Sequence, residues 1–216
     1  MNLCTRLLTN YSRLCEILLH LFWPCNCPIC GRPGKIICPD CLKSLFWEEI
    51  LTKNFEGLTI HSAAFYHTDI NRIISAFKYS GVRALCKPVG QAMAKFFTRL
   101  DNVDYLVPVP LHVNSSRSYN QAYEIAKGMS EIWRINIFNE AKWAYDMKSR
   151  AGLNADERLK LKSDAFIVPR NIHGLRVAII DDVCTTGATL SRFSQACKYS
   201  GANVICAYTL ATVSAS

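Results

Sequence analysis

The chain has 216 residues, of which 50% are hydrophobic and 19% are charged. These values predict a packed core and exclude an extensively disordered protein. Lysine and arginine outnumber aspartate and glutamate by 25 to 17, a formal net charge of +8. Such an excess favours anionic partners such as nucleotides, sugar phosphates or nucleic acid, although many basic proteins bind none of these. The length suits one good-sized domain, or one domain with a small added module.

The first element in chain order is an amphipathic helix within residues 1–24. Leu14, Leu18 and Leu21 are among the apolar residues that recur there at helical spacing. Arg6 and Glu16 interrupt the segment, which makes it too charged for a secretory signal or a membrane span. We expect this helix to pack on the body of the protein or on another subunit, with contact to a membrane surface as the alternative. The expected location of a protein without an export signal or a transmembrane segment is the cytoplasm.

The next segment, 25–58, carries a dense group of cysteines. Two C-x2-C pairs, "CPIC" and "CPDC", contain Cys27, Cys30, Cys38 and Cys41. Each pair can present two thiolates from one tight turn, and two pairs together make a tetrahedral sulfur site that suits structural zinc. Thiol redox chemistry and a metal-free module are the alternatives. Cys25 is a fifth thiol within reach, but Cys27 is preferred because its spacing to Cys30 matches the second pair.

From residue 59 to residue 216 strand-like and helix-like segments alternate. The strand-like segments are 59–66, 105–110, 135–138, 165–168, 176–182 and 203–213, and the helix-like segments are 69–81, 84–100, 118–133 and 187–202. This alternation predicts an α/β domain with a mostly parallel sheet flanked by helices. The polar segment 146–162 is expected to be a loop, where ligand contacts often gather.

The stretch "VAIIDDVCTTGATL", residues 177–190, carries the clearest chemistry. An apolar strand, "VAII", is followed by Asp181 and Asp182, which we expect at the edge of the sheet where ligands bind. The loop that follows can hold an anion through its backbone N–H groups, and Gly187 allows close approach. Ribose hydroxyls and a magnesium ion would neutralise the carboxylates, so the stretch predicts a sugar phosphate with magnesium. An acidic cap on an ordinary helix, a phosphoacceptor site and another metal site are the alternatives.

This stretch closely resembles the phosphoribosyl-pyrophosphate motif of type I phosphoribosyltransferases. The resemblance implies that Asp181 and Asp182 hold the ribose hydroxyls and act as the catalytic residues, by stabilising an oxocarbenium-like ribose. It further implies that the 5′-phosphate is held by the loop residues Thr185, Thr186, Gly187, Ala188 and Thr189.

A narrower resemblance covers about residues 20–212. "CPICG", "CPDC", "AFKYSG", "VPVPLH", "RSYNQA" and "IDDVCTTGATL", in this order, are similar to the ComF family. The resemblance implies a type I phosphoribosyltransferase fold with an N-terminal Cys4 zinc module, and a role in DNA uptake during natural transformation. It places the pyrophosphate-binding loop at "VPVPLH", residues 107–112, with Pro110 and Leu111 on the pyrophosphate side and Arg117 and Lys78 as cationic contacts. Ser118 departs from the family, whose members usually carry glycine there.

Three functions follow from these observations. The first is a DNA-uptake protein that binds phosphoribosyl pyrophosphate, single-stranded DNA and other parts of the uptake machinery. The second is a magnesium-dependent phosphoribosyltransferase of nucleotide metabolism, whose acceptor the sequence does not identify. The third is a sensor of phosphoribosyl pyrophosphate without catalysis. No general base is evident from the sequence.

Overall fold

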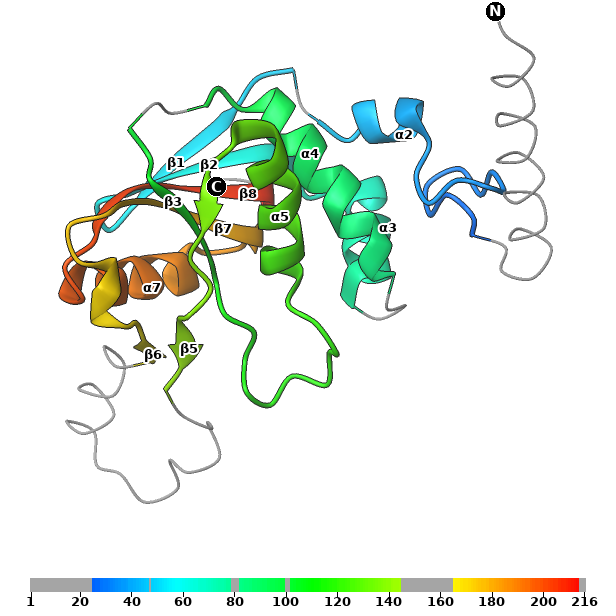
Figure 1. Cartoon of the computed structure of the whole chain (residues 1–216). Coiled ribbons are helices and arrows are strands. Elements are labelled where there is room, and N and C mark those ends of the chain that lie inside the picture. Colours follow the sequence, from blue (N-terminus) through cyan, green and yellow to red (C-terminus); the bar gives the residue numbers. More distant parts are fainter. Residues whose placement is uncertain (1–24, 47, 79–81, 100–101, 145–164, 214–216) are drawn as a thin grey trace, which may run out of the picture.

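The computed structural model describes residues 25–213 except 47, 79–81, 100–101 and 145–164. The helix predicted within 1–24 and the polar segment 146–162 therefore lie outside the described residues. At the centre is a six-stranded sheet with the order β1-β2-β8-β7-β3-β4 (Figure 1). Its strands are β1 Leu51–Phe55, β2 Leu58–Phe65, β3 Tyr105–Pro108, β4 Asn136–Ile137, β7 Arg176–Cys184 and β8 Asn203–Thr212. All neighbours pair in parallel except β1 and β2, which pair antiparallel. The predicted α/β class with a mostly parallel sheet is confirmed.

The central strand β7 is apolar on both sides, as is typical of a parallel strand covered by helices on both faces. Ala178 and Ile180 belong to one hydrophobic cluster, and Val177 and Ile179 to the other. Because successive side chains of a strand point to opposite faces, this run fills the two cores that the helices cover.

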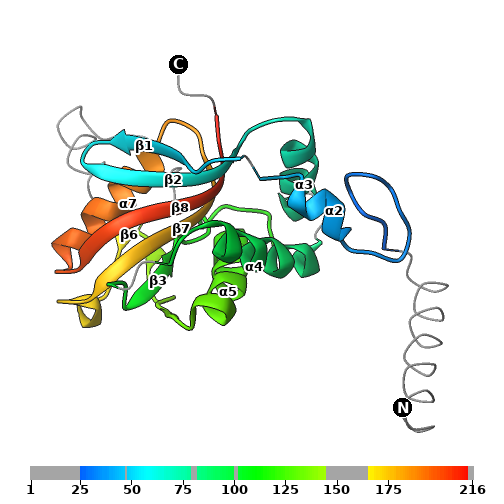
Figure 2. The same cartoon turned by 90° about the horizontal axis from the view of Figure 1, so that it is seen from above.

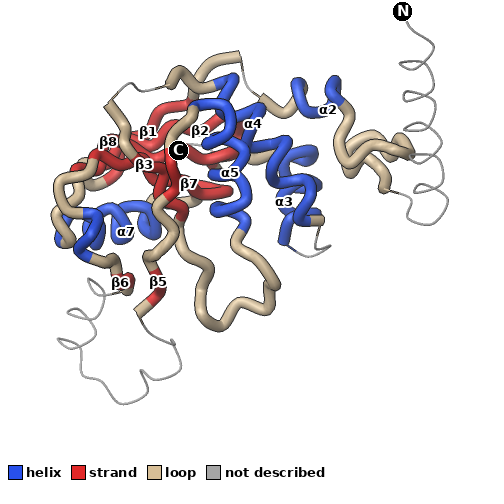
Figure 3. Tube along the Cα trace, viewed as in Figure 1, coloured by secondary structure: helices blue, strands red, loops and turns tan. Residues whose placement is uncertain are grey.

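Helices cover both faces of the sheet. The helices α3 Thr68–Lys78, α4 Cys86–Phe96 and α5 Gln121–Trp133 line one face, and α7 Ala188–Tyr199 lies on the other (Figures 2 and 3). Helices α4 and α5 pack closely because glycines face each other's backbone. A Cβ atom on Gly90 would lie 2.1 Å from the carbonyl oxygen of Ile125, and one on Gly128 would lie 2.3 Å from that of Lys87.

Most predicted elements are present, with shifted ends. Helix α4 follows a 3₁₀ turn at Arg83–Leu85 and ends at Phe96 instead of residue 100. Helix α5 begins at Gln121, because the Asn120 side chain caps it by accepting a hydrogen bond from the backbone N–H of Tyr123 (3.4 Å). The strand expected at 165–168 is β6 Phe166–Ile167, which leaves the main sheet to pair with β5 Lys142–Trp143.

Strand β1 was not predicted and lies within the range assigned to the cysteine module. It joins β2 through a two-residue turn with Glu56 and Gly57 at positive φ. Strand β1 pairs with β2 and is the edge strand of the main sheet.

The cysteine module packs against α3 and α4. It contains a short helix, α2 Pro39–Lys43. The carbonyl oxygen of Ile29 accepts a hydrogen bond from Arg72 Nη1 of α3 (3.1 Å), and the ring of Phe46 stacks on Phe96 of α4 with centroids 5.3 Å apart. These contacts tie the module to the helical face that covers the sheet. Among the described residues, no helix combines the length and apolar character that crossing a membrane requires.

Candidate functional site

A pocket opens where the carboxyl ends of β3 and β7 meet the end of α3 and the loop before α5. Its volume is about 540 Å³, counting the part open to solvent. Six of the predicted site residues line it: Lys78, Pro110, Leu111, Arg117, Asp181 and Asp182. The structure therefore brings together side chains from widely separated segments at the sheet edge where parallel α/β folds bind ligands.

The two aspartates lie inside β7 and not beyond its end. The strand was expected over residues 176–182, and it continues to Cys184 through pairing with β8. The backbone N–H of Asp182 donates a hydrogen bond to Asp181 Oδ1 (2.8 Å). Loss of hydration, with the adjacent charge of Asp182, raises the pKa of Asp181 to about 8. Asp181 is thus mainly protonated at neutral pH.

Asp182 is paired with a lysine from another element. Its Oδ2 atom lies 2.9 Å from the Nζ of Lys78, the last residue of α3. Asp182 is 7% exposed, and Oδ2 accepts no well-aligned hydrogen bond within the described part of the chain. A magnesium ion held directly by Oδ2 would bring a second positive charge next to the Lys78 ammonium. With Lys78 in this place, the residues do not fit a magnesium ion held directly by Asp182.

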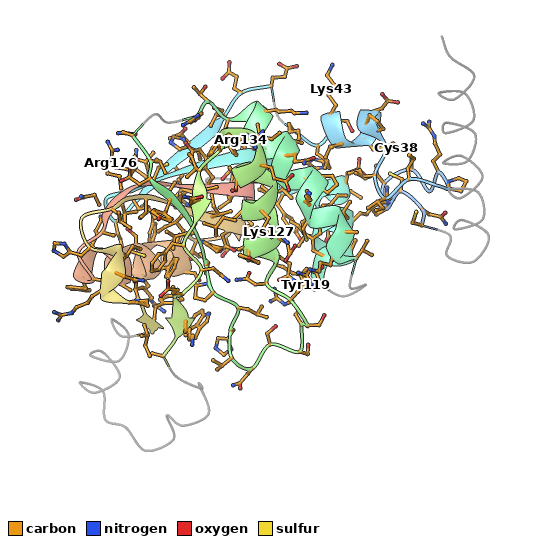
Figure 4. The ribbon with its side chains drawn as sticks, in the orientation of Figure 1. Cys38, Lys43, Tyr119, Lys127, Arg134 and Arg176 are labelled. Atoms are coloured by element: carbon orange, nitrogen blue, oxygen red, sulfur yellow. The ribbon has the colours of Figure 1, made fainter. Side chains whose placement is uncertain are left out.

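Lys78 and Arg117, two cationic residues of the pocket, are both positioned by hydrogen bonds to the segment at the start of α5. Arg117 Nη1 donates to Gln121 Oε1 (2.8 Å), while Gln121 Nε2 donates to the carbonyl oxygen of Phe77 (3.3 Å). The Tyr119 hydroxyl donates to the same carbonyl (2.6 Å). Figure 4 shows Tyr119 at the end of α5 that faces α3. The position of Lys78, directly after Phe77, is therefore fixed by the segment that also holds Arg117.

The pocket also contains two residues that were not singled out as site residues from the sequence. His112 and Trp143 line it with ring centroids 4.8 Å apart, and Trp143 Nε1 donates to the carbonyl oxygen of Pro110 (2.6 Å). His112 ends the predicted loop "VPVPLH", so its type and place could have marked it. Trp143 lies on the two-residue strand β5, where no local pattern signals a site.

The threonine loop, Thr185–Thr189, is not part of the pocket lining but follows β7 at the same edge. Gly187 has φ +95° and precedes α7 without a capping side chain. The Thr186 hydroxyl oxygen accepts from the backbone N–H of Ala188 (3.2 Å). Thr185, Thr186 and Thr189 are exposed, so their hydroxyls can reach an anion beside the first turn of α7. A Cβ atom at Gly187 would lie 3.0 Å from Cγ of Phe55, so the β1–β2 hairpin confines this loop.

The predicted cysteine ligands form a compact group. The sulfur atoms of Cys27, Cys30, Cys38 and Cys41 all lie within 4.8 Å of one another, and Cys25 is outside this group. Cys30 Sγ and Cys38 Sγ are 3.6 Å apart. A tetrahedron with zinc–sulfur bonds of about 2.3 Å has sulfur atoms about 3.8 Å apart, so these thiols could hold a metal ion such as zinc. Figure 4 shows Cys38 in the module, apart from the sheet.

One thiol of this group is prepared for metal binding. Burial acts to raise the pKa of Cys27, but hydrogen bonds from the backbone of Cys30, Cys38 and Ile29 prevail and lower it to about 6. Burial raises the pKa of Cys41 to about 12, together with the neighbouring thiols. Neighbouring thiolates repel one another, so a cysteine cluster without a metal ion favours one thiolate beside neutral thiols.

Comparison with known proteins gives relatives along most of the chain. No protein-family model matches it. Competence protein F of Haemophilus influenzae is 29% identical over 202 residues, covering 85% of this chain and 84% of the relative. Competence protein ComFC of Bacillus subtilis is 27% identical over 198 residues, covering 86% and 74%. The resemblance to the ComF family is thereby confirmed.

Among solved structures, the allosteric regulatory enzyme of purine biosynthesis aligns with 80% of this chain at 17% identity and a TM-score of 0.47. The match spans 30% of that enzyme's length.

Proposed function

We propose that the pocket binds phosphoribosyl pyrophosphate, and that the protein acts in the cytoplasm in the uptake of single-stranded DNA for natural transformation. The observation that carries the ligand is the convergence of Lys78, Arg117 and the aspartate pair in one pocket. The names of the two competence relatives support the role in DNA uptake.

The ribose, the 5′-phosphate and the diphosphate of phosphoribosyl pyrophosphate each have complementary groups at the carboxyl-terminal edge of the sheet. Protonated Asp181 and ionised Asp182 can donate to and accept from the ribose hydroxyls. The loop Thr185–Thr189 offers hydroxyls and N–H groups to the 5′-phosphate. We place the diphosphate beside Pro110, Leu111 and Arg117. The predicted magnesium ion would be bound by oxygens of the diphosphate, and no residue of the pocket is assigned to it.

Isothermal titration with phosphoribosyl pyrophosphate tests the ligand. The variant Arg117→Gln should weaken binding about tenfold or more, because it removes a charged contact to an anion. Arg134→Gln is the matched control, since Arg134 lies at the opposite end of α5 from Arg117 (Figure 4). No binding by the wild type, or equal losses in both variants, would refute the assignment.

Zinc and DNA belong to the same proposal. We assign a structural zinc ion to Cys27, Cys30, Cys38 and Cys41, and elemental analysis should find about one equivalent per chain. Cys38→Ser should lose the metal and Cys25→Ser should retain it. The module, in a chain with a formal net charge of +8, is proposed to contact single-stranded DNA. Labelled single strands should bind more tightly at low salt, and undetectable binding there would reject this part.

A second candidate function is phosphoribosyl transfer to a nitrogen acceptor in nucleotide metabolism. His112 favours it, because the imidazole lines the pocket and could take a proton from the acceptor. Pyrophosphate release in the presence of candidate bases and amines tests this function. Release that needs an acceptor and is lost in His112→Gln would support transfer, whereas binding without release would support the binding protein or sensor.

A further inference from the structure

The acidic pair of the pocket already has a cation. The ammonium of Lys78 lies 2.9 Å from Asp182 Oδ2, and the two side chains are 22% and 10% exposed. An ion pair this shielded from water is screened far less than a surface pair. The sequence suggested that ribose hydroxyls and a magnesium ion neutralise these carboxylates. In the structure, Lys78 neutralises Asp182 instead.

The lysine is held in place from outside the pair. Phe77, which precedes it, accepts hydrogen bonds at its carbonyl from Tyr119 and Gln121, and Gln121 is 2% exposed. Helix α3 therefore ends against the start of α5, with Lys78 directed to β7. These hydrogen bonds fix the backbone from which the Lys78 side chain extends toward Asp182.

The charges of the pocket then balance without a metal. Lys78 cancels Asp182, and Asp181 is mainly neutral because its pKa is raised to about 8. Arg117, which hydrogen-bonds Gln121, adds a positive charge. An anionic sugar phosphate can approach this pocket without a divalent ion beside the carboxylates.

We infer that Lys78 takes the place of magnesium as the counter-ion of Asp182, so that the pocket binds phosphoribosyl pyrophosphate in the absence of magnesium. This inference rests on the proposed function. It makes Lys78 a positioning and charge-balancing residue, and it distinguishes this pocket from one in which a metal ion bridges carboxylates and donor.

The test is calorimetric titration with phosphoribosyl pyrophosphate, once with millimolar magnesium and once with a chelator that leaves the cysteine-bound metal in place. The wild type should bind with affinities that differ less than about threefold between the two conditions. Lys78→Gln should lose about tenfold or more without magnesium and recover part of that loss with it. Lys78→Arg should keep magnesium-independent binding.

Lys127→Gln is the matched control, because Lys127 is also an ion-paired lysine, 3.4 Å from Glu124, and lies on α5 outside the pocket (Figure 4). It should leave affinity and magnesium dependence unchanged. Binding by the wild type that requires magnesium would overturn the inference and leave the proposed function standing. No binding in either condition would overturn the proposed function itself. If Lys78→Gln does not fold, the affinities of the wild type with and without magnesium still test the inference.

Discussion

Replacing Gly187 with alanine tests how tightly the threonine loop is built. Gly187 has φ +95°, a region that costs an L-residue about 1–2 kcal/mol. The added Cβ would also lie 3.0 Å from Cγ and 3.2 Å from Cβ of Phe55, a crowding that costs about 1–3 kcal/mol. The free energy of unfolding should therefore fall by about 2–5 kcal/mol, and the affinity for phosphoribosyl pyrophosphate should fall with it.

Urea denaturation measures the loss, and Gly57→Ala is the matched control. Gly57 has φ +75°, but a Cβ atom added there would meet nothing within 4 Å, so alanine adds backbone strain without crowding. Gly187→Ala should thus cost about 1–3 kcal/mol more than Gly57→Ala. In a Phe55→Ala background, which removes Cγ but keeps the Cβ atom at 3.2 Å, the difference between the two substitutions should become smaller. Equal costs with Phe55 present would refute the idea that the hairpin confines the loop.

Two further predictions concern packing and pH. Gly90→Ala should lower the free energy of unfolding by about 3 kcal/mol or more in urea titrations, because its Cβ would lie 2.1 Å from the carbonyl oxygen of Ile125. The folded protein keeps the Asp181 proton up to about pH 8, whereas the unfolded chain releases it near its ordinary pKa. Stability should therefore fall as pH rises from about 4 to about 8, and less so in Asp181→Asn; parallel profiles would contradict this.

The regular elements of the domain could be predicted because their apolar patterns are clear. Strand β7 contains a continuous apolar run that is buried on both faces, and helix α5 buries apolar residues at helical spacing. Strand β1 was missed because its five residues carry a weak pattern, and its place depends on pairing with β2. The turn at Glu56–Gly57 between two strand-like runs was the available signal.

The site was predictable where its residues are contiguous. The aspartates and the threonine loop follow one another along a single stretch, so their joint chemistry could be recognised. Lys78 and Arg117 were indicated by family resemblance alone, since no local pattern separates them from other solvated cations. The contact of Lys78 with Asp182 depends on where α3 ends against α5, which tertiary packing decides.

Two carboxylates beside an anion-binding loop pose an electrostatic problem that the structure resolves in two different ways. Asp182 keeps its charge and receives an ammonium, while Asp181 gives up its charge because hydration is lost and Asp182 is adjacent. The two responses depend on each other, since an ionised Asp182 makes ionisation of Asp181 harder. Removing Lys78 would leave Asp182 without its counter-ion, so the pair would need another cation. The acidic pair and Lys78 therefore form one electrostatic unit, and loss of the charge on Lys78 or Asp182 changes the charge that an incoming phosphate meets.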